Sequence, residues 1–260
     1  MKNKKRYYII LIILIIFALI MYFTLGKENI KKSEESTTII IGDNSIWNYS
    51  DRRWLNITNE TTINSINWLD YEVHMDNKKI GKYYLWYDGS KWYMFDTNRK
   101  AVVKDGNLIA YRSNYDIKIK DFQLGEIKNY YYVNKILKEN NINNITEFTT
   151  TTETTLDLDN DGKNETLYFV SNVFPTETNP ATIFSIVFMV KNNEIYPIYT
   201  DIAKNNSYNG CKPYLSAVLD VDNDNTYELV VSCGRYSVQK PVDMLYKLTD
   251  NGFKILISNQ

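Results

Sequence analysis

The sequence predicts a mainly β protein built from antiparallel meanders, with two similar four-stranded units in its C-terminal half. Three observations lead to this prediction. Short segments rich in β-branched and aromatic residues are separated by Asn, Asp and Gly, which is typical of strands joined by tight turns. An acidic loop occurs twice, and each copy is followed by an apolar run that reads as a strand. Between the β-rich parts, one segment has helical spacing.

An N-terminal segment is predicted to span the membrane. Residues 7–25 contain no charge, and their centre, Ile9–Ile16, consists only of Ile and Leu. A helix over this stretch, at about 1.5 Å rise per residue, covers the hydrocarbon core of a bilayer. The stretch is longer than the apolar part of a cleaved signal peptide, and no small-residue cleavage motif follows. Residues 1–26 would therefore be a cytoplasmic tail and an uncleaved signal anchor, with the bulk of this single-pass protein extracytoplasmic.

The segments between the anchor and the first acidic loop are assigned from composition and periodicity. Residues 27–43 are predicted to be a linker. Residues 44–123 are rich in aromatics and alternate, with a tight turn at Asp88-Gly89, so we expect an antiparallel meander. Residues 124–145 should hold one helix, because apolar positions from Leu124 to Asn140 fit helical spacing without a Pro. This helix would bridge the two β regions.

Residues 146–260 divide into two units with the same order: strand, acidic loop, strand, strand, turn, strand. The expected strands of the first unit are 149–158, 165–171, 182–191 and 194–199. Those of the second unit are 213–221, 227–233, 242–248 and 253–257. A repeated four-strand meander is the signature of propeller blades or related sheets. The prediction is therefore two propeller-blade-like units.

The two acidic loops carry the chemistry. The first runs from Asp157 to Glu165 and the second from Asp220 to Glu228, with carboxylates at positions 1, 3, 5 and 9 of both. Such groups repel one another unless a cation lies among them, and Ca²⁺ takes six to eight oxygen ligands. We therefore predict two Ca²⁺ sites. Their candidate ligands are the side chains of Asp157, Asp159, Asp161 and Glu165 with the carbonyl of Lys163, and the side chains of Asp220, Asp222, Asp224 and Glu228 with the carbonyl of Thr226.

The spacing excludes an EF-hand, which needs a bidentate Glu at position 12. That position holds Tyr168 in the first loop and Val231 in the second. Position 6 is Gly162 or Asn225, and both residue types tolerate the positive φ of a turn over an ion. A pair of acidic hairpin turns without metal is the alternative, because Asp, Asn and Gly favour turns. Matched spacing in two copies favours the metal.

The pattern D-x-D-x-D-G-x-x-E before an apolar strand resembles the calcium loops of FG-GAP/VCBS-type repeats. The resemblance covers residues 149–258, and the second loop departs from it at Asn225, where the pattern has Gly. Those repeats build integrin-alpha-like β-propellers, with the loop between the first two strands of a blade. The resemblance implies a structural ion and a secreted or surface protein, without a fixed activity. Two blades are fewer than a typical closed propeller has.

Cys211 and Cys233 are the only cysteines, and they flank the second acidic loop. A disulfide needs Cα atoms within about 7 Å. Regular pairing across the loop would place Cys233 opposite Leu215, so the bond requires a bend near Gly210 or Pro213. A disulfide in an oxidising compartment and two buried free thiols are both compatible with the sequence.

Composition argues against nucleic-acid binding and against several kinds of active site. The net charge is −1, and the chain beyond its basic N-terminus is more acidic still, whereas nucleic-acid-binding domains normally present a basic surface. His74 is the only histidine and lies in an alternating segment, so a site with several His ligands is excluded. The sequence has no phosphate-binding glycine motif. We assign no catalytic residue.

The favoured interpretation is a membrane-anchored calcium-binding module that serves as a surface binding or scaffold domain. Its partner would be a cell-wall polymer or another surface protein. The alternatives are a glycan-directed envelope hydrolase that uses two carboxylates and an envelope sensor domain. The segment Trp86–Asp96 resembles one hairpin of a choline-binding cell-wall repeat. Without an array of such hairpins, cross-strand aromatic packing is the favoured explanation.

Overall fold

The computed structural model describes residues 36–43, 45–50, 53–103, 105–114, 116–142, 149–173, 182–203, 210–235 and 241–259. Two helices and three antiparallel sheets make up these residues, which confirms the mainly β fold class. No helix within these ranges is long and apolar enough to cross a bilayer. The predicted membrane anchor lies outside the described residues and stays a prediction.

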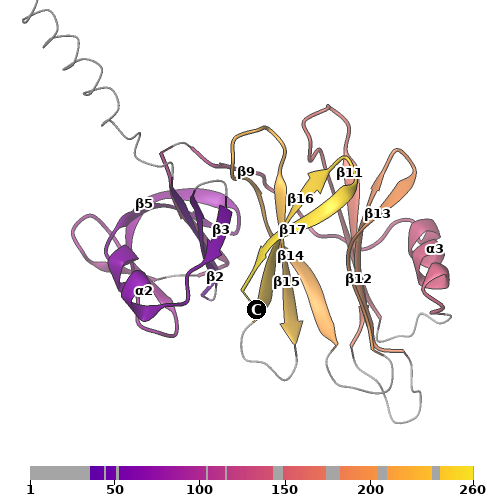
Figure 1. Ribbon diagram of the computed structural model, residues 1–260, viewed down its shortest axis with the longest axis horizontal. Helices are drawn as coiled ribbons and strands as arrows, with labels where there is room; N and C mark the ends of the chain where they lie inside the picture. The colour runs from indigo at the N-terminus through magenta and orange to yellow at the C-terminus, as the bar shows by residue number, and fades with distance from the viewer. Residues whose placement is uncertain are drawn as a thin grey trace, which may run out of the picture.

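The N-terminal part of the described chain forms an eight-stranded sheet in the order β3-β2-β1-β8-β4-β5-β6-β7. Figure 1 shows this sheet curled into a ring, with the short helix α2 (Glu60–Ile66) next to it. The strands are β1 (Thr37–Ile41), β2 (Ser45–Ser50), β3 (Arg53–Asn56), β4 (Asp70–Met75), β5 (Lys78–Tyr87), β6 (Trp92–Phe95), β7 (Ala101–Val102) and β8 (Leu108–Arg112).

Two sequence-based expectations for this region are wrong. The described part of the predicted linker, residues 27–43, contains the central strand β1, which pairs with both β2 and β8. Residues 44–123 are not a simple meander, because β8 lies between β1 and β4, and α2 was not expected. In β1, Ile39 and Ile41 face one core while Ile40 faces another. A strand buried on both faces shows no polar alternation, so periodicity does not mark it.

Each predicted unit around an acidic loop is a four-strand antiparallel meander. The first has the order β10-β11-β12-β13, and the second has the order β17-β16-β15-β14 with the short strand β9 added beside β14. All strands expected in residues 146–260 are present, with small differences at their ends. Their bounds are β9 (Lys118–Ile119), β10 (Thr150–Leu156), β11 (Glu165–Asn172), β12 (Phe184–Lys191), β13 (Glu194–Ile202), β14 (Cys211–Asp220), β15 (Glu228–Arg235), β16 (Val242–Thr249) and β17 (Gly252–Ser258).

The two meanders pack face to face, and they lie side by side in Figure 1. Leu167 and Phe169 of β11 share one apolar cluster with Leu229 and Val231 of β15. On its other face, the second meander packs against the curled sheet through a cluster that includes Leu219. Burial of these alternating side chains from both sheets is the main force that holds the layers together.

Helix α3 (Tyr131–Glu139) covers the outer face of the first meander. Its buried residues Val133, Ile136 and Leu137 pack against side chains of β11 and β12. The helix is shorter than the predicted 124–145, because Gly125 instead pairs with Glu153 as an extended bridge at the edge of β10. The helix therefore caps one meander rather than bridging two β regions.

Cys211 and Cys233 form a disulfide, with their Cα atoms 5.3 Å apart. The expected register would have separated them. The pairing between β14 and β15 shifts between Leu215 and Ala217, which places Cys233 opposite Pro213. Two one-residue differences produce this register: Leu219 pairs with Glu228 rather than with Leu229, and a β-bulge adds one extra residue between Leu215 and Ala217.

A buried carboxylate joins the curled sheet to the second meander. Asp243 on β16 is 3% exposed and accepts hydrogen bonds from the hydroxyls of Ser45 (2.5 Å) and Ser232. Burial raises the pKa of Asp243, while the two hydroxyl donors oppose that rise. Asn259 donates to Ser45 and accepts from the Asp243 N–H. This network fixes the start of β2 against the start of β16.

Candidate metal centre

Each acidic loop connects the first two strands of its meander and turns through residues at positive φ. Asn160 and Gly162 have φ of 55° and 82° in the first loop, and Asn223 and Asn225 have 58° and 68° in the second. These are positions 4 and 6 of both loops. The positive φ expected at position 6 is therefore confirmed, and Asn225 adopts it without a glycine, as Asn tolerates this region best among the other residues.

The loops gather carboxylate oxygens as the sequence predicted. Oxygens of Asp157, Asp159 and Glu165 lie within 4.8 Å of one another, and so do oxygens of Asp220, Asp222 and Asp224. Clusters of this size are compatible with one cation each. The remaining predicted side chains, Asp161 and Glu228, belong to the same groups through shared lysine contacts described below.

The glutamate at position 9 closes each loop. Glu165 and Glu228 are 1% and 0% exposed, and one oxygen of each accepts the N–H of position 2, Leu158 at 2.8 Å and Val221 at 3.0 Å. Burial raises the pKa of Glu228 to about 7, although the Val221 N–H and the nearby Lys247 ammonium oppose the rise. The second oxygen of each glutamate faces the cluster.

The aspartates at positions 1 and 5 hold the backbone of the turn. Asp157 accepts the N–H of Gly162 at 3.1 Å, and Asp220 accepts that of Asn225 at 3.2 Å. The predicted carbonyl ligands use their N–H groups in the same way: Lys163 donates to Asp161 and Thr226 donates to Asp224, both at 2.8 Å. The two loops thus share one hydrogen-bond pattern, position by position.

Several carboxylate oxygens point into the clusters and are buried. Asp157 Oδ1, Asp159 Oδ1 and Asp220 Oδ1 have no hydrogen-bond partner among the described residues, and neither have Glu165 Oε1 and Glu228 Oε1. The two glutamate oxygens have only a lysine at ion-pair distance. The position-1 oxygens Asp157 Oδ1 and Asp220 Oδ1 therefore have no partner in either loop, and the position-9 oxygens are paired only with a lysine. Buried charges without partners are costly, so these atoms fit a bound cation.

A lysine that the sequence analysis missed lies at each cluster. Lys247 Nζ is 2.7 Å from Asp222 and Asp224 and 3.0 Å from Glu228. Lys191 Nζ contacts Asp159 and lies 3.4 Å from both Asp161 and Glu165. Burial alone would lower the pKa of both lysines, but their carboxylate partners raise it above the usual value. Each lysine lies on the third strand of its meander, outside the loop motif. The sequence of the loop therefore does not indicate it, and only the pairing of the second and third strands would have.

The two loops also touch each other, which the sequence did not indicate. The side chain of Asn160 donates to the Asn225 carbonyl at 2.6 Å, and the Tyr227 N–H donates to the Leu158 carbonyl at 2.8 Å. The two candidate metal clusters therefore lie next to each other at one end of the packed meanders.

Strand β9 and the residue after it bring two more cations to these loops. The ammonium of Lys118 donates to Asn225 at 2.6 Å and lies 3.4 Å from Asp220. Lys120 donates to the Asp157 carbonyl and lies over the ring of Tyr227 at 4.5 Å. Neither lysine is a hydrogen-bond partner of Asp157 Oδ1 or Asp220 Oδ1.

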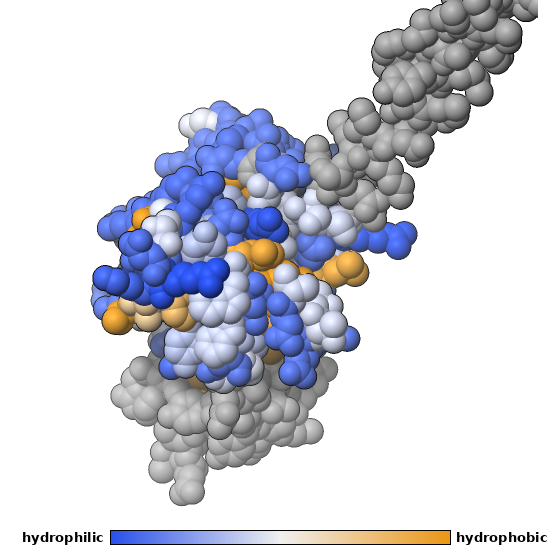
Figure 2. All heavy atoms as spheres, turned by 90° about the vertical axis from the view of Figure 1, so that its left-hand side faces the viewer, coloured by the Kyte–Doolittle hydropathy of each residue, from blue (hydrophilic) through white to orange (hydrophobic). Residues whose placement is uncertain are grey.

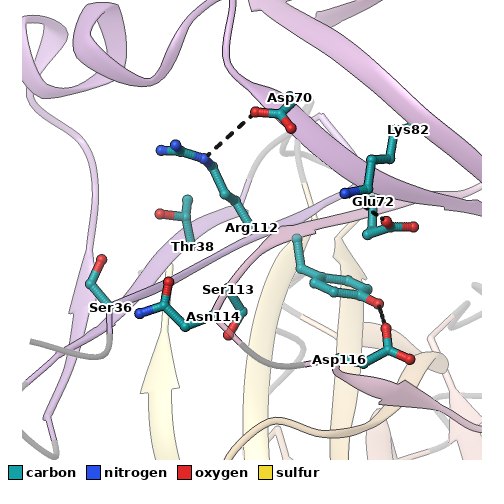
Figure 3. Close-up of a pocket in the computed structure, with 10 residues that line it drawn as sticks. Ser36, Thr38, Asp70, Glu72, Lys82, Arg112, Ser113, Asn114 and Asp116 are labelled. Carbon is teal, nitrogen blue, oxygen red and sulfur yellow. Dashed lines mark hydrogen bonds and ion pairs between the residues drawn. The ribbon is translucent and has the colours of Figure 1, made fainter. Parts of the chain in front are cut away.

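A polar pocket of about 530 Å³ lies on the curled sheet (Figure 3). Its carboxylates have partners: Glu72 pairs with Lys79 at 2.9 Å, and Asp116 accepts the hydroxyl of Tyr111 at 2.6 Å. Asp70 has Arg112 at 4.0 Å. A glycosidase acid needs a carboxyl kept protonated by an apolar environment. The pairing seen here is typical of structural ion pairs, so we assign no catalytic residue to this pocket.

Aromatic side chains gather on the outer face of the β5–β6 hairpin. Trp68 is 43% exposed and packs near Trp86 and Phe95, with ring centroids 6.4 Å and 4.7 Å away. The row continues from Trp86 to Tyr93 at 5.4 Å, and Arg99 lies over Trp68 at 5.8 Å. This aromatic row comes from the hairpin that the sequence analysis singled out, with Trp68 as an addition.

Trp68 is held in a conformation that a bulky residue seldom adopts. Its φ is 63°, and its N–H donates to the Leu85 carbonyl at 2.7 Å. The preceding Asn67 side chain accepts the Tyr87 N–H at 2.8 Å, which pins the segment to β5. A bulky residue at positive φ is uncommon, and these hydrogen bonds hold Trp68 in that conformation. Figure 2 faces the curled-sheet side of Figure 1 and shows a largely hydrophilic surface with a few scattered hydrophobic side chains.

Comparison with protein-family models, with curated proteins and with solved structures finds no match for this chain. The resemblance to FG-GAP/VCBS-type repeats therefore rests on the loop residues alone.

Proposed function

We propose that the C-terminal half is a pair of Ca²⁺-stabilised, propeller-blade-like units, one ion to each acidic loop. In this proposal Asp157, Asp159, Asp161, Glu165 and the Lys163 carbonyl hold the first ion. Asp220, Asp222, Asp224, Glu228 and the Thr226 carbonyl hold the second. The ion would neutralise the clustered carboxylates and clip the first two strands of each meander together.

The observation that carries this proposal is a buried oxygen at position 1 of both loops that has no hydrogen-bond partner among the described residues, next to a position-9 oxygen that meets only a lysine ammonium. Lys191 supplies one positive charge to the first cluster, and Lys247 and Lys118 supply two to the second, whereas each loop contributes four carboxylates. The remaining negative charge favours a divalent cation with hard-oxygen preference. The matching hydrogen bonds of the two loops support equivalent sites.

Thermal unfolding in the presence of Ca²⁺ tests this proposal. A ligand that binds only the folded state raises the midpoint with its concentration, so we expect the midpoint of the full-length protein in mild detergent to rise on titration with Ca²⁺. Asp159→Ala and Asp222→Ala should each remove part of that rise. Asp105→Ala, at an exposed position outside both loops, should leave it unchanged. An unshifted midpoint at millimolar Ca²⁺ would contradict the proposal.

We further propose that the whole chain is a membrane-anchored, extracytoplasmic surface module that binds or supports a wall polymer. The disulfide between Cys211 and Cys233 supports an oxidising compartment. The aromatic row around Trp68 favours a glycan as the partner, because flat rings flanked by polar groups bind the apolar faces of sugars while the surroundings stay hydrophilic. A surface scaffold for another protein is the alternative role.

Trp68→Ala should weaken the binding of the full-length protein to insoluble cell-wall polysaccharide by about tenfold, the effect of losing one stacking surface worth about 1.4 kcal/mol. Co-sedimentation of protein with the polymer measures this. Tyr131→Ala removes an aromatic side chain that is 63% exposed on helix α3 and serves as the matched control. Equal retention of both variants would argue against the aromatic row as the binding surface.

A further inference from the structure

A lysine occupies the same structural position in both meanders. Thr166 pairs with Val190 in the first meander and Leu229 pairs with Tyr246 in the second, so the next pairs along place Lys191 beside Glu165 and Lys247 beside Glu228. The lysines come from the third strand, outside the loop motif. Their recurrence in both units, each against the buried glutamate, indicates a shared role rather than a chance surface ion pair.

Each ammonium competes for the oxygens that would bind the metal. Lys247 Nζ lies 2.7–3.0 Å from three carboxylates, which matches the three donors of an ammonium group. Ca²⁺ binds oxygen at 2.3–2.6 Å, so the ion and the ammonium cannot share Glu228 Oε1 and its neighbours at the same time. In the first cluster, Lys191 and an ion would compete in the same way for oxygens of Asp159 and Glu165.

Both lysine side chains are partly exposed, so each ammonium can move from its cluster into solvent. Their side chains are 17% and 20% exposed, whereas the glutamates they face are 1% and 0% exposed. Lysine is a flexible chain with a strongly hydrated head. The buried carboxylates are thus fixed by the fold, and the ammonium is the partner that can move to water.

We propose that Lys191 and Lys247 are tethered counter-ions that hold the acidic loops when metal is absent and are displaced when Ca²⁺ binds. Each lysine then lowers the affinity of its own loop for the ion and keeps the metal-free loop folded. This inference rests on the proposed Ca²⁺ binding and adds its regulation: the loops respond to high Ca²⁺ concentrations, and the meanders do not unfold at low ones.

Lysine-to-methionine variants test the inference, since methionine keeps the apolar length of the side chain and removes its charge. We expect Lys191→Met and Lys247→Met in the full-length protein to raise the Ca²⁺ affinity of one site each by about tenfold or more, measured by calorimetric titration. The same variants should unfold at a lower temperature than the unmodified protein in chelator. Lys191→Arg and Lys247→Arg, which keep the charge, should keep the metal-free stability.

Lys212→Met serves as the control, because Lys212 is exposed on β14 opposite Gly234, away from the clusters. It should change neither affinity nor metal-free stability. Ca²⁺ binding by the unmodified protein with unchanged affinity in both methionine variants would overturn the tethered counter-ion and leave the proposed calcium function standing. Ca²⁺ binding by the methionine variants alone would support the counter-ion and show that it blocks the site. No binding by any of these proteins would overturn both.

Discussion

Removing the disulfide is expected to lower the free energy of unfolding by about 3 kcal/mol, because the bond closes a loop between residues 22 positions apart and restricts the unfolded chain. Cys211 and Cys233 are 0% and 1% exposed, so Cys211→Ala/Cys233→Ala keeps the interior apolar. Denaturant unfolding of the double variant, compared with the oxidised protein, gives the difference. The second acidic loop lies in the segment between the two cysteines, so we expect this loop to become disordered before the rest of the protein unfolds.

The protein under reducing conditions provides the control for this prediction. Reduction removes the bond without a substitution, so reduced protein and double variant should unfold at similar denaturant concentrations. If the double variant were as stable as the oxidised protein, the bond would not contribute as the chain-entropy argument requires.

Glu228→Ala is expected to cost about 2–3 kcal/mol, since the buried Val221 N–H loses its acceptor and a cavity remains in place of the side chain. Asp224→Ala is the matched comparison. Asp224 contacts the same lysine, but its side chain is 45% exposed, so its loss should cost no more than about 1 kcal/mol. Chemical denaturation in chelator measures both. Equal losses in the two variants would mean that the glutamate does not close the loop.

The same glutamate gives a pH dependence with a definite sign. Burial raises the pKa of Glu228 in the metal-free protein from 4.5 to about 7, so the folded state binds the proton more tightly than the unfolded chain. The contribution of this group to stability is present below about pH 4.5 and is lost as the pH rises to about 7. Glu228→Gln cannot ionise, and it should therefore gain stability relative to the unmodified protein over that pH range in chelator.

The C-terminal half could be predicted from sequence because local signals and tertiary structure agree there. Strand β12 is an apolar run that ends at the Asn192-Asn193 turn, β15 is an apolar run that follows the second acidic loop, and the occurrence of two similar units strengthened the prediction. The curled sheet could not be predicted in the same way. Its centre depends on the pairing of β1 with β8, two segments far apart in the chain, and no local pattern encodes that pairing. Gly125 left the predicted helix because it pairs with a distant strand.

The candidate site was predicted only as far as one continuous motif reached. The motif supplied the acidic side chains and the turn at position 6, where Asn225 replaces Gly. It could not supply Lys191 or Lys247, which reach the clusters through strand pairing from outside the loop. It also gave no sign that the Tyr227 N–H binds the other loop. Contacts of this kind follow from how the sheets stack, which a single sequence does not show.

Strand β9 determines where the chain can be divided. Composition suggests a boundary near residue 123, but Lys118 and Ile119 pair with Asp220 and Leu219 at the margin of the second meander. A fragment that starts after this boundary would leave the backbone hydrogen-bonding groups of β14 unpaired at the edge of the sheet. Exposed edge strands pair with other chains and cause aggregation. A fragment that keeps both acidic loops and the pairing of β14 with β9 must therefore begin no later than Lys118.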